Sequence, residues 1–148
     1  MTNELTVLEA LKSVLISDVN QYLPEQCTPL SCKNVVFDFP EVDNMPSDVT
    51  VFVNGNYAEY TELATINDES TFTVSVFLIV KRDTKSNLTE KMYKYFNGIY
   101  QAIRKSMSLN GAVDFTMITD ADFYPAVEAN KNVQGVEITV AVHYTKDF

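Results

Sequence analysis

The chain has no tryptophan, one histidine, two cysteines and only four glycines among its 148 residues. The glycines are scattered, so the sequence lacks the glycine-rich loop that cradles phosphates in nucleotide-binding proteins. His143 is the sole imidazole, and its place on the outward face of the last predicted strand offers it no obvious nucleophile. Two cysteines and a distant histidine do not make a four-ligand zinc site. These shortages argue against an enzyme, and we predict no catalytic residue, cofactor or metal.

Long hydrophobic runs and positive charge are also scarce. No apolar run approaches the ~20 residues that a membrane helix requires. The first residues, Met1–Leu5, lack the basic stretch of a secretory signal. The net charge is −9, which would on average repel a phosphate backbone. We therefore expect a chain made in the cytosol that binds neither a membrane nor a specific nucleic acid.

The length favours one domain over residues 1–148, because such a chain buries roughly 68–70% of its unfolded surface without a metal or disulfide. Residues 24–48 contain four of the five prolines and are predicted as a long loop, of the kind that is functional or packed against a neighbour. Cys27 and Cys32 lie within this loop. Reduced thiols are usual in a cytosolic protein, although a local disulfide is geometrically feasible.

The stretch that organises the chain is a long predicted strand over 71–82, followed by a helix over 87–109. The strand begins in strict alternation, with Thr71, Thr73 and Ser75 on the polar face. The other face is apolar throughout and comprises Phe72, Val74, Val76, Leu78 and Val80. The polar face then turns apolar at Phe77 and Ile79. These two side chains need a second cover, from either more of this chain or another subunit.

The predicted helix over 87–109 has clear boundaries. Asn87 and Glu90 match a capping box, and Asn110-Gly111 supplies the left-handed residue that commonly ends a helix. Its apolar stripe comprises Leu88, Met92, Tyr95 or Phe96, Ile99, Ile103 and Met107. Its outer side carries Lys91, Lys94, Arg104 and Lys105. These cations form either a solvated face, favourable near the helix C-terminus, or a docking face for an acidic neighbour.

The remaining elements are predicted from periodicity and turn signals. Before the central strand we expect a helix over 3–23, a short edge strand over 34–39, strands over 49–54 and 57–66 joined by a turn at 54–56, and a polar turn at 67–70. After the helix we expect a strand over 113–119, a turn at 119–122, an edge strand over 123–129, a loop over 130–135 and a last strand over 136–145. Asp120 and Asp122 fit that turn better than a calcium loop. This order predicts an α+β fold, with a mainly antiparallel sheet of four to six strands and two helices packed on one face.

Four aromatic residues stand near predicted turns or edge strands, namely Tyr57, Tyr60, Phe123 and Tyr124. Aromatic side chains are enriched in interface cores, and the alternative is that these four belong to the core of the single chain. With Phe77, Ile79 and the four cations of the helix, they complete the set of candidate interface residues.

The whole ordering resembles the tail terminator, or tail completion, proteins of tailed bacteriophages and of prophage-derived tail particles. The resemblance covers most of the chain and rests on its size and on the segments TFTVSVFLIVKR, NLTEKMYKYFNGIYQAIRKSM and VQGVEITVAVHYTKDF. It implies a hexameric ring that caps the tail tube, stops its polymerisation and offers a docking surface to the head connector, without catalysis. The implied partners are other copies of the chain, the tail tube protein and the head–tail connector protein.

The resemblance also implies a location, in the virion tail or in the host cytoplasm during assembly. Six acidic copies would surround a negative channel, through which DNA slides because no cations hold its phosphates. The alternative from the residues alone is a small cytosolic α+β domain that binds a partner or ligand without catalysis.

Overall fold

A computed structural model describes residues 2–64, 66–84 and 86–147. The order of elements is α1 (Glu4–Ser17), a 3₁₀ turn (Asp18–Gln21), β1 (Val35–Val36), a second 3₁₀ turn (Val42–Asn44), β2 (Val49–Ala64), β3 (Asn67–Lys81), α2 (Leu88–Lys105), β4 (Phe115–Tyr124) and β5 (Val133–Asp147). The five strands form one sheet in the order β1-β2-β3-β5-β4. Among the described strands, only the short β1–β2 pair is parallel. The predicted α+β class is confirmed.

Strand β3 is the centre of the sheet, and it pairs along its whole length with β2 and with β5. The apolar face predicted for it is confirmed, because Phe72, Val74, Val76, Leu78 and Val80 are all buried. The matching positions of β5 are buried too, and they comprise Val136, Ile138, Val140, Val142 and Tyr144. Alternation on two adjacent strands therefore builds one continuous apolar face.

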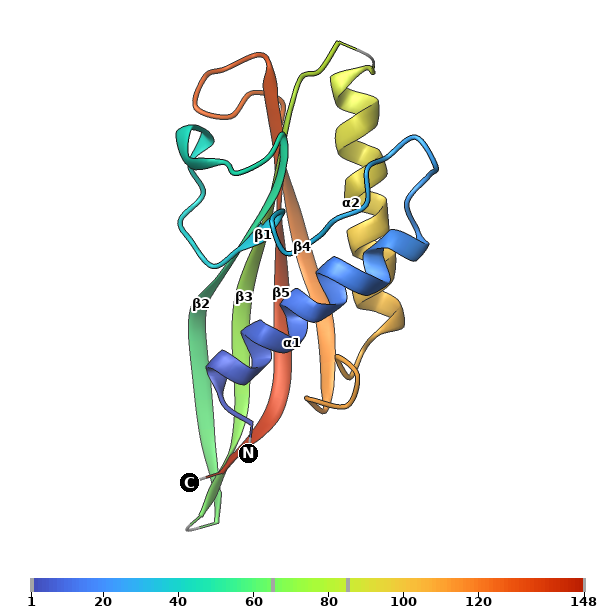
Figure 1. The fold of residues 1–148 in the computed structure, drawn as a ribbon. Coiled ribbons are helices and arrows are strands. Elements are labelled where there is room, and N and C mark those ends of the chain that lie inside the picture. Colours follow the sequence, from blue (N-terminus) through green and yellow to red (C-terminus); the bar gives the residue numbers. More distant parts are fainter. Residues whose placement is uncertain (1, 65, 85, 148) are drawn as a thin grey trace.

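Both helices cover that face, and Figure 1 shows α1 crossing the strands diagonally. The Asn3 side chain caps α1 by accepting a hydrogen bond of 2.9 Å from the Thr6 N–H. The Asn87 side chain caps α2 in the same way through Glu90 N–H. The buried helix residues that join the common core are Val7, Leu11, Val14 and Leu15 of α1, and Leu88, Met92, Tyr95, Ile99, Ala102 and Ile103 of α2.

The chain itself covers the apolar end of the opposite face. Ile79 is fully buried there in a second, smaller core with Val42, Phe52, Val127 and Val133. Phe77 packs against this cluster and remains partly exposed. The second cover thus comes from the 3₁₀ turn over 42–44 and from the segment that leads into β5.

Two predicted turns are wrong, because each lies inside a continuous strand. Residues 54–56 form a β-bulge in β2, where the register with β3 shifts between Gly55 and Tyr57. A second bulge lies in β4 between Ile118 and Asp120, within the predicted turn 119–122. Small and polar residues are common both in turns and in bulges, because each places a residue outside the regular ladder of backbone hydrogen bonds.

Other boundaries also need correction. The predicted turn at 67–70 is the start of β3, and β2 and β3 project as a long hairpin whose strands meet at Ala64 and Asn67. This polar run is a strand because β2 pairs with it on one side and β5 on the other, from Asn67 opposite Asp147 onward. The predicted edge strand 123–129 ends at Tyr124, and β5 already begins at Val133 inside the predicted loop.

The ends of the helices differ from the prediction as well. Helix α2 ends at Lys105, before the left-handed residues Leu109, Asn110 and Gly111, so Met107 is exposed beyond it. The α-helix predicted over 3–23 ends at Ser17 and continues only as a 3₁₀ turn.

Candidate interaction surfaces

On the sheet face opposite the helices, the part beyond the second core has no described helix over it, and we call this surface the open face. It comprises Tyr57 and Glu59 of β2, Thr71, Thr73 and Ser75 of β3, Glu137, Thr139, Ala141 and His143 of β5, and Phe115, Met117, Asp120 and Asp122 of β4. Tyr57 and Met117 keep 58% and 49% of their surface exposed, so apolar groups remain uncovered on it.

All charged residues of the open face are acidic. Asp122 lies directly opposite Glu137 on the neighbouring strand. The Ser75 hydroxyl donates a hydrogen bond of 2.8 Å to the Glu137 carboxylate. Burial, followed by the charges of Glu137 and Asp122, raises the pKa of Tyr124 above its ordinary value. The open face therefore presents a negative field without a basic partner among its own members.

His143 is on the open face, as predicted. Its ring stacks on Phe115 with centroids 4.2 Å apart, and its Nδ1 lies 3.1 Å from the Thr71 hydroxyl. No acidic side chain or thiol contacts it through a hydrogen bond in the described chain. The arrangement orders a polar surface and provides no activated nucleophile.

A groove of about 690 Å³ separates the open face from the second core. Its lining includes Phe39, Phe77, Tyr124 and Glu137. Phe77 and Tyr124 stack with ring centroids 5.4 Å apart, and Phe39 is 71% exposed. Two of the candidate interface residues thus meet at the edge of an accessible aromatic groove.

A second aromatic group lies on the helix side, at the junction of α2 and β4. Phe123 stacks on Tyr93 at 5.2 Å and meets Phe96 edge-on at 5.0 Å between ring centroids. Phe96 in turn lies 6.0 Å from Tyr100. Phe123 and its neighbour Tyr124 therefore serve opposite faces of the sheet, as adjacent strand residues must.

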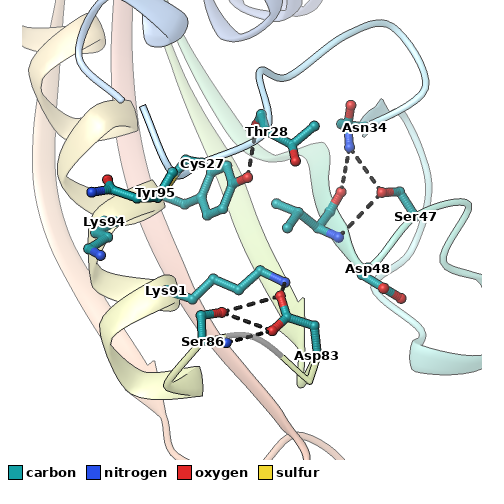
Figure 2. A pocket seen from close by; sticks show the side chains of 12 residues that line it. Cys27, Thr28, Asn34, Ser47, Asp48, Asp83, Ser86, Lys91, Lys94 and Tyr95 are labelled. Carbon is teal, nitrogen blue, oxygen red and sulfur yellow. Dashed lines mark hydrogen bonds and ion pairs between the residues drawn. The ribbon is translucent and has the colours of Figure 1, made fainter. Parts of the chain in front are cut away.

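The four cations predicted on one outer side of the helix, as either a solvated or a docking face, separate into two environments. Lys91 and Lys94 line a pocket of about 280 Å³ between α2 and the proline-rich segment, with Cys27 and Tyr95 (Figure 2). Lys91 forms an ion pair of 2.9 Å with Asp83, which leaves it only 13% exposed. Arg104 and Lys105 are exposed in the last turn of α2. Only the latter two present a solvated basic surface.

A hydrogen bond in the same pocket joins the proline-rich segment to α2. The Tyr95 hydroxyl donates a hydrogen bond of 2.8 Å to the Thr28 carbonyl (Figure 2). Burial raises the pKa of Tyr95 to about 12 and also raises the pKa of the Cys27 thiol. A thiol with a raised pKa is a poor nucleophile, and both cysteines are unpaired.

Tyr60, another candidate, belongs to a polar cluster around Glu4 at the start of α1. The Glu4 carboxylate accepts hydrogen bonds from the Tyr60 hydroxyl at 2.7 Å, the Tyr144 hydroxyl at 2.6 Å and the Lys146 ammonium at 2.6 Å. Partial burial raises the pKa of Glu4, but the hydrogen bonds from Lys146, Tyr144 and Tyr60 outweigh it and lower the pKa to about 2. The cluster ties the first helix to the projecting hairpin.

The described residues contain no group of three or more side chains placed to hold a metal ion. Within the same part of the chain, no helix is long and apolar enough to cross a membrane.

The architecture is that of a two-layer α+β protein, with helices on one face of the sheet and part of the other face uncovered. Comparison with solved structures shows the same kind of fold in another protein. It is similar to a sheath/tube terminator of an extracellular contractile injection system, the PVC particle in its extended state, with a TM-score of 0.55 and 12% sequence identity. The match covers 99% of this chain and 58% of that protein, so this chain spans less than two thirds of its neighbour's length.

No family model matches the sequence, and no curated protein matches it. The resemblance to tail terminators that the sequence suggested is thus confirmed in the fold. The interface roles of the ten candidate residues remain a prediction.

Sequence reasoning did not single out Phe115 or Met117 as surface residues, nor Glu4 as an anchoring carboxylate. The first two follow from β4 being an edge strand of a half-covered sheet, which depends on the order of the strands. In the sequence, Glu4 is an acidic residue in the first turn of a helix, which is common and does not indicate which groups bind it.

Proposed function

We propose that the chain is a tail terminator: it assembles as a ring on the end of a tail tube, stops tube growth and offers its outer end to a connector protein. The observation that carries the proposal is the match of 99% of the chain to a protein described as a sheath/tube terminator. The uncovered aromatic groove and the open face supply surfaces that an assembly would use.

In this proposal the open face lines the channel of the ring. The face has no helix over it, and its charged members are Glu59, Asp120, Asp122 and Glu137. DNA is held on proteins chiefly by cations that replace its counterions, so an acidic wall lets it pass. The helices then lie on the outside, where Arg104 and Lys105 face neighbouring components.

The decisive experiment polymerises the cognate tube protein with and without this chain and measures tube lengths by negative-stain electron microscopy. We expect shorter tubes of narrower length distribution, with extra density at one end. Tubes of unchanged length with bare ends would refute the terminator role and favour the alternative of a partner- or ligand-binding domain.

A matched variant tests the channel separately. Replacing Asp120, Asp122 and Glu137 by lysine should leave capping intact and cause the capped tubes to retain DNA at low salt. As a control with the same change of charge, lysines in place of Glu9, Glu25 and Glu90, which are exposed outside the open face, should retain less DNA. Equal retention by the two variants would show that the open face does not line the channel.

A further inference from the structure

The sheet ends in two unpaired edges, one on β2 and one on β4. Strand β1 pairs with β2 only at Val51 and Phe52. Beyond these residues, no described strand occupies the outer side of β2. Strand β4 pairs with β5 on one side and with no described strand on the other. Unpaired edges expose rows of backbone N–H and C=O groups that can accept another strand.

The two edges match in height across the sheet. Met117 pairs with Ala141, which pairs with Thr73, which pairs with Tyr57. Phe115 reaches Glu59 by the same path through His143 and Thr71. Two copies that stand side by side at the same height would therefore bring Met117 of one next to Tyr57 of the other.

The edges also match in direction. β2 and β3, β3 and β5, and β5 and β4 are all antiparallel. Four alternating strands leave β2 and β4 running in opposite directions. When copies are related by rotation about an axis along the strands, the new pair is antiparallel as well, and the alternation continues through every copy.

Charge and shape favour a second copy of this chain as the occupant. The stretches that would meet at the centre of the seam, 55–58 of β2 and 116–119 of β4, contain no charged residue in a chain of net charge −9. Each edge also has a bulge, between Gly55 and Tyr57 and between Ile118 and Asp120. Gly55 and Ile118 stand at the same height, through Val74 and Val140. A bulge bends an edge away from a regular strand, so the fitting partner is one that bends at the same level.

We infer that copies of this chain join head to tail by pairing β4 of one with β2 of the next, in a seam that places Met117 opposite Tyr57. The inference rests on the proposed ring and names its contact. A contact between two different surfaces closes into a ring when the rotation per copy divides a full turn. The open faces then form one continuous wall.

Cysteine cross-linking tests the seam. In a Cys27→Ser, Cys32→Ser background, the double variant Tyr57→Cys, Met117→Cys is treated with a short bis-maleimide, alone at high concentration and on tail tubes. We expect a ladder of cross-linked species that ends at the closed ring. The single variants should stay monomeric on denaturing gels, and their equimolar mixture should stop at a dimer, because each chain then carries one reactive edge.

The control places the second cysteine inside the sheet at the same height and on the same face. Ala141 pairs with Met117 and is half-buried on the open face. The variant Tyr57→Cys, Ala141→Cys should give no ladder. A ladder from this control, or none from the Tyr57, Met117 pair both free and on tubes, would overturn the seam.

The two proposals fail separately. Tubes that are capped by the Tyr57, Met117 variant without cross-links would overturn the seam and leave the terminator role standing. Cross-linked closed rings that leave tube length unchanged would support the seam and refute the terminator role.

Discussion

Replacing Glu4 by glutamine should destabilise the protein near neutral pH by removing the charge that three donors converge on. Tyr60, Tyr144 and Lys146 all donate to this one carboxylate. Its pKa falls from 4.5 to about 2 in the folded chain. A shift of that size corresponds to about 3 kcal/mol at 1.36 kcal/mol per pH unit. Because the Glu4 side chain keeps 29% of its exposure, solvent screening reduces the expected loss to about 1–2 kcal/mol.

The effect has a defined pH dependence. The folded pKa lies below the ordinary value, so the carboxylate contributes its full stability above pH 4.5, and this is lost as the pH falls toward 2. The difference between wild type and Glu4→Gln in urea unfolding should therefore be constant at pH 6–7 and should shrink toward zero as the pH approaches 2.

Glu9→Gln is the matched control, because Glu9 is exposed on the same helix. It should change the free energy of unfolding by less than about 0.5 kcal/mol. If Glu4→Gln unfolds at the same urea concentration as wild type at pH 7, or if the difference persists unchanged at pH 2, the cluster does not stabilise the fold electrostatically.

Three further substitutions have expected outcomes. Gly135→Ala should lower the free energy of unfolding by about 1–3 kcal/mol in chemical denaturation. The new Cβ would lie 2.9 Å from the Leu78 carbonyl oxygen and 3.0 Å from the Phe77 ring. An unchanged unfolding midpoint would contradict this contact. Asp122→Asn should raise the free energy of unfolding by about 0.2–1 kcal/mol at pH 7, because it removes a like charge opposite Glu137, whereas Asp114→Asn outside the strands should not. Tyr95→Phe removes the hydrogen bond to the Thr28 carbonyl, so it should lower the free energy of unfolding by about 0.5–1.5 kcal/mol. It should also speed proteolysis within residues 24–34. Cleavage at the wild-type rate would show that other contacts hold this segment.

Local patterns in the sequence predict the main elements well. The alternation from Phe72 to Val80 and the Asn87 cap of α2 are both confirmed. Each of these signals lies within one element and depends on burial against a single large core. The edge position of the segment around Val35 and Val36 is also confirmed, because its short run between prolines allows little pairing.

The errors arise where contacts with residues distant in the sequence determine the local structure. Gly55 and Thr119 lie in signals that suit a turn, yet the chain continues as a strand because the partner strand continues. The cover over Ile79 comes from Val42, Val127 and Val133, which are distant in sequence and show no shared periodicity. The free edges depend on β5 inserting between β3 and β4, a placement that no local pattern encodes.

The central place of β5 has a consequence for the order of folding. The hairpin of β2 and β3 closes a short loop, so its pairing is local and fast. β4 precedes β5 in the chain and, among the described strands, pairs with β5 alone, so β4 joins the sheet together with β5 or after it. During synthesis the β4 edge of the seam therefore cannot be in place before β5 has been made, which delays self-association through this edge.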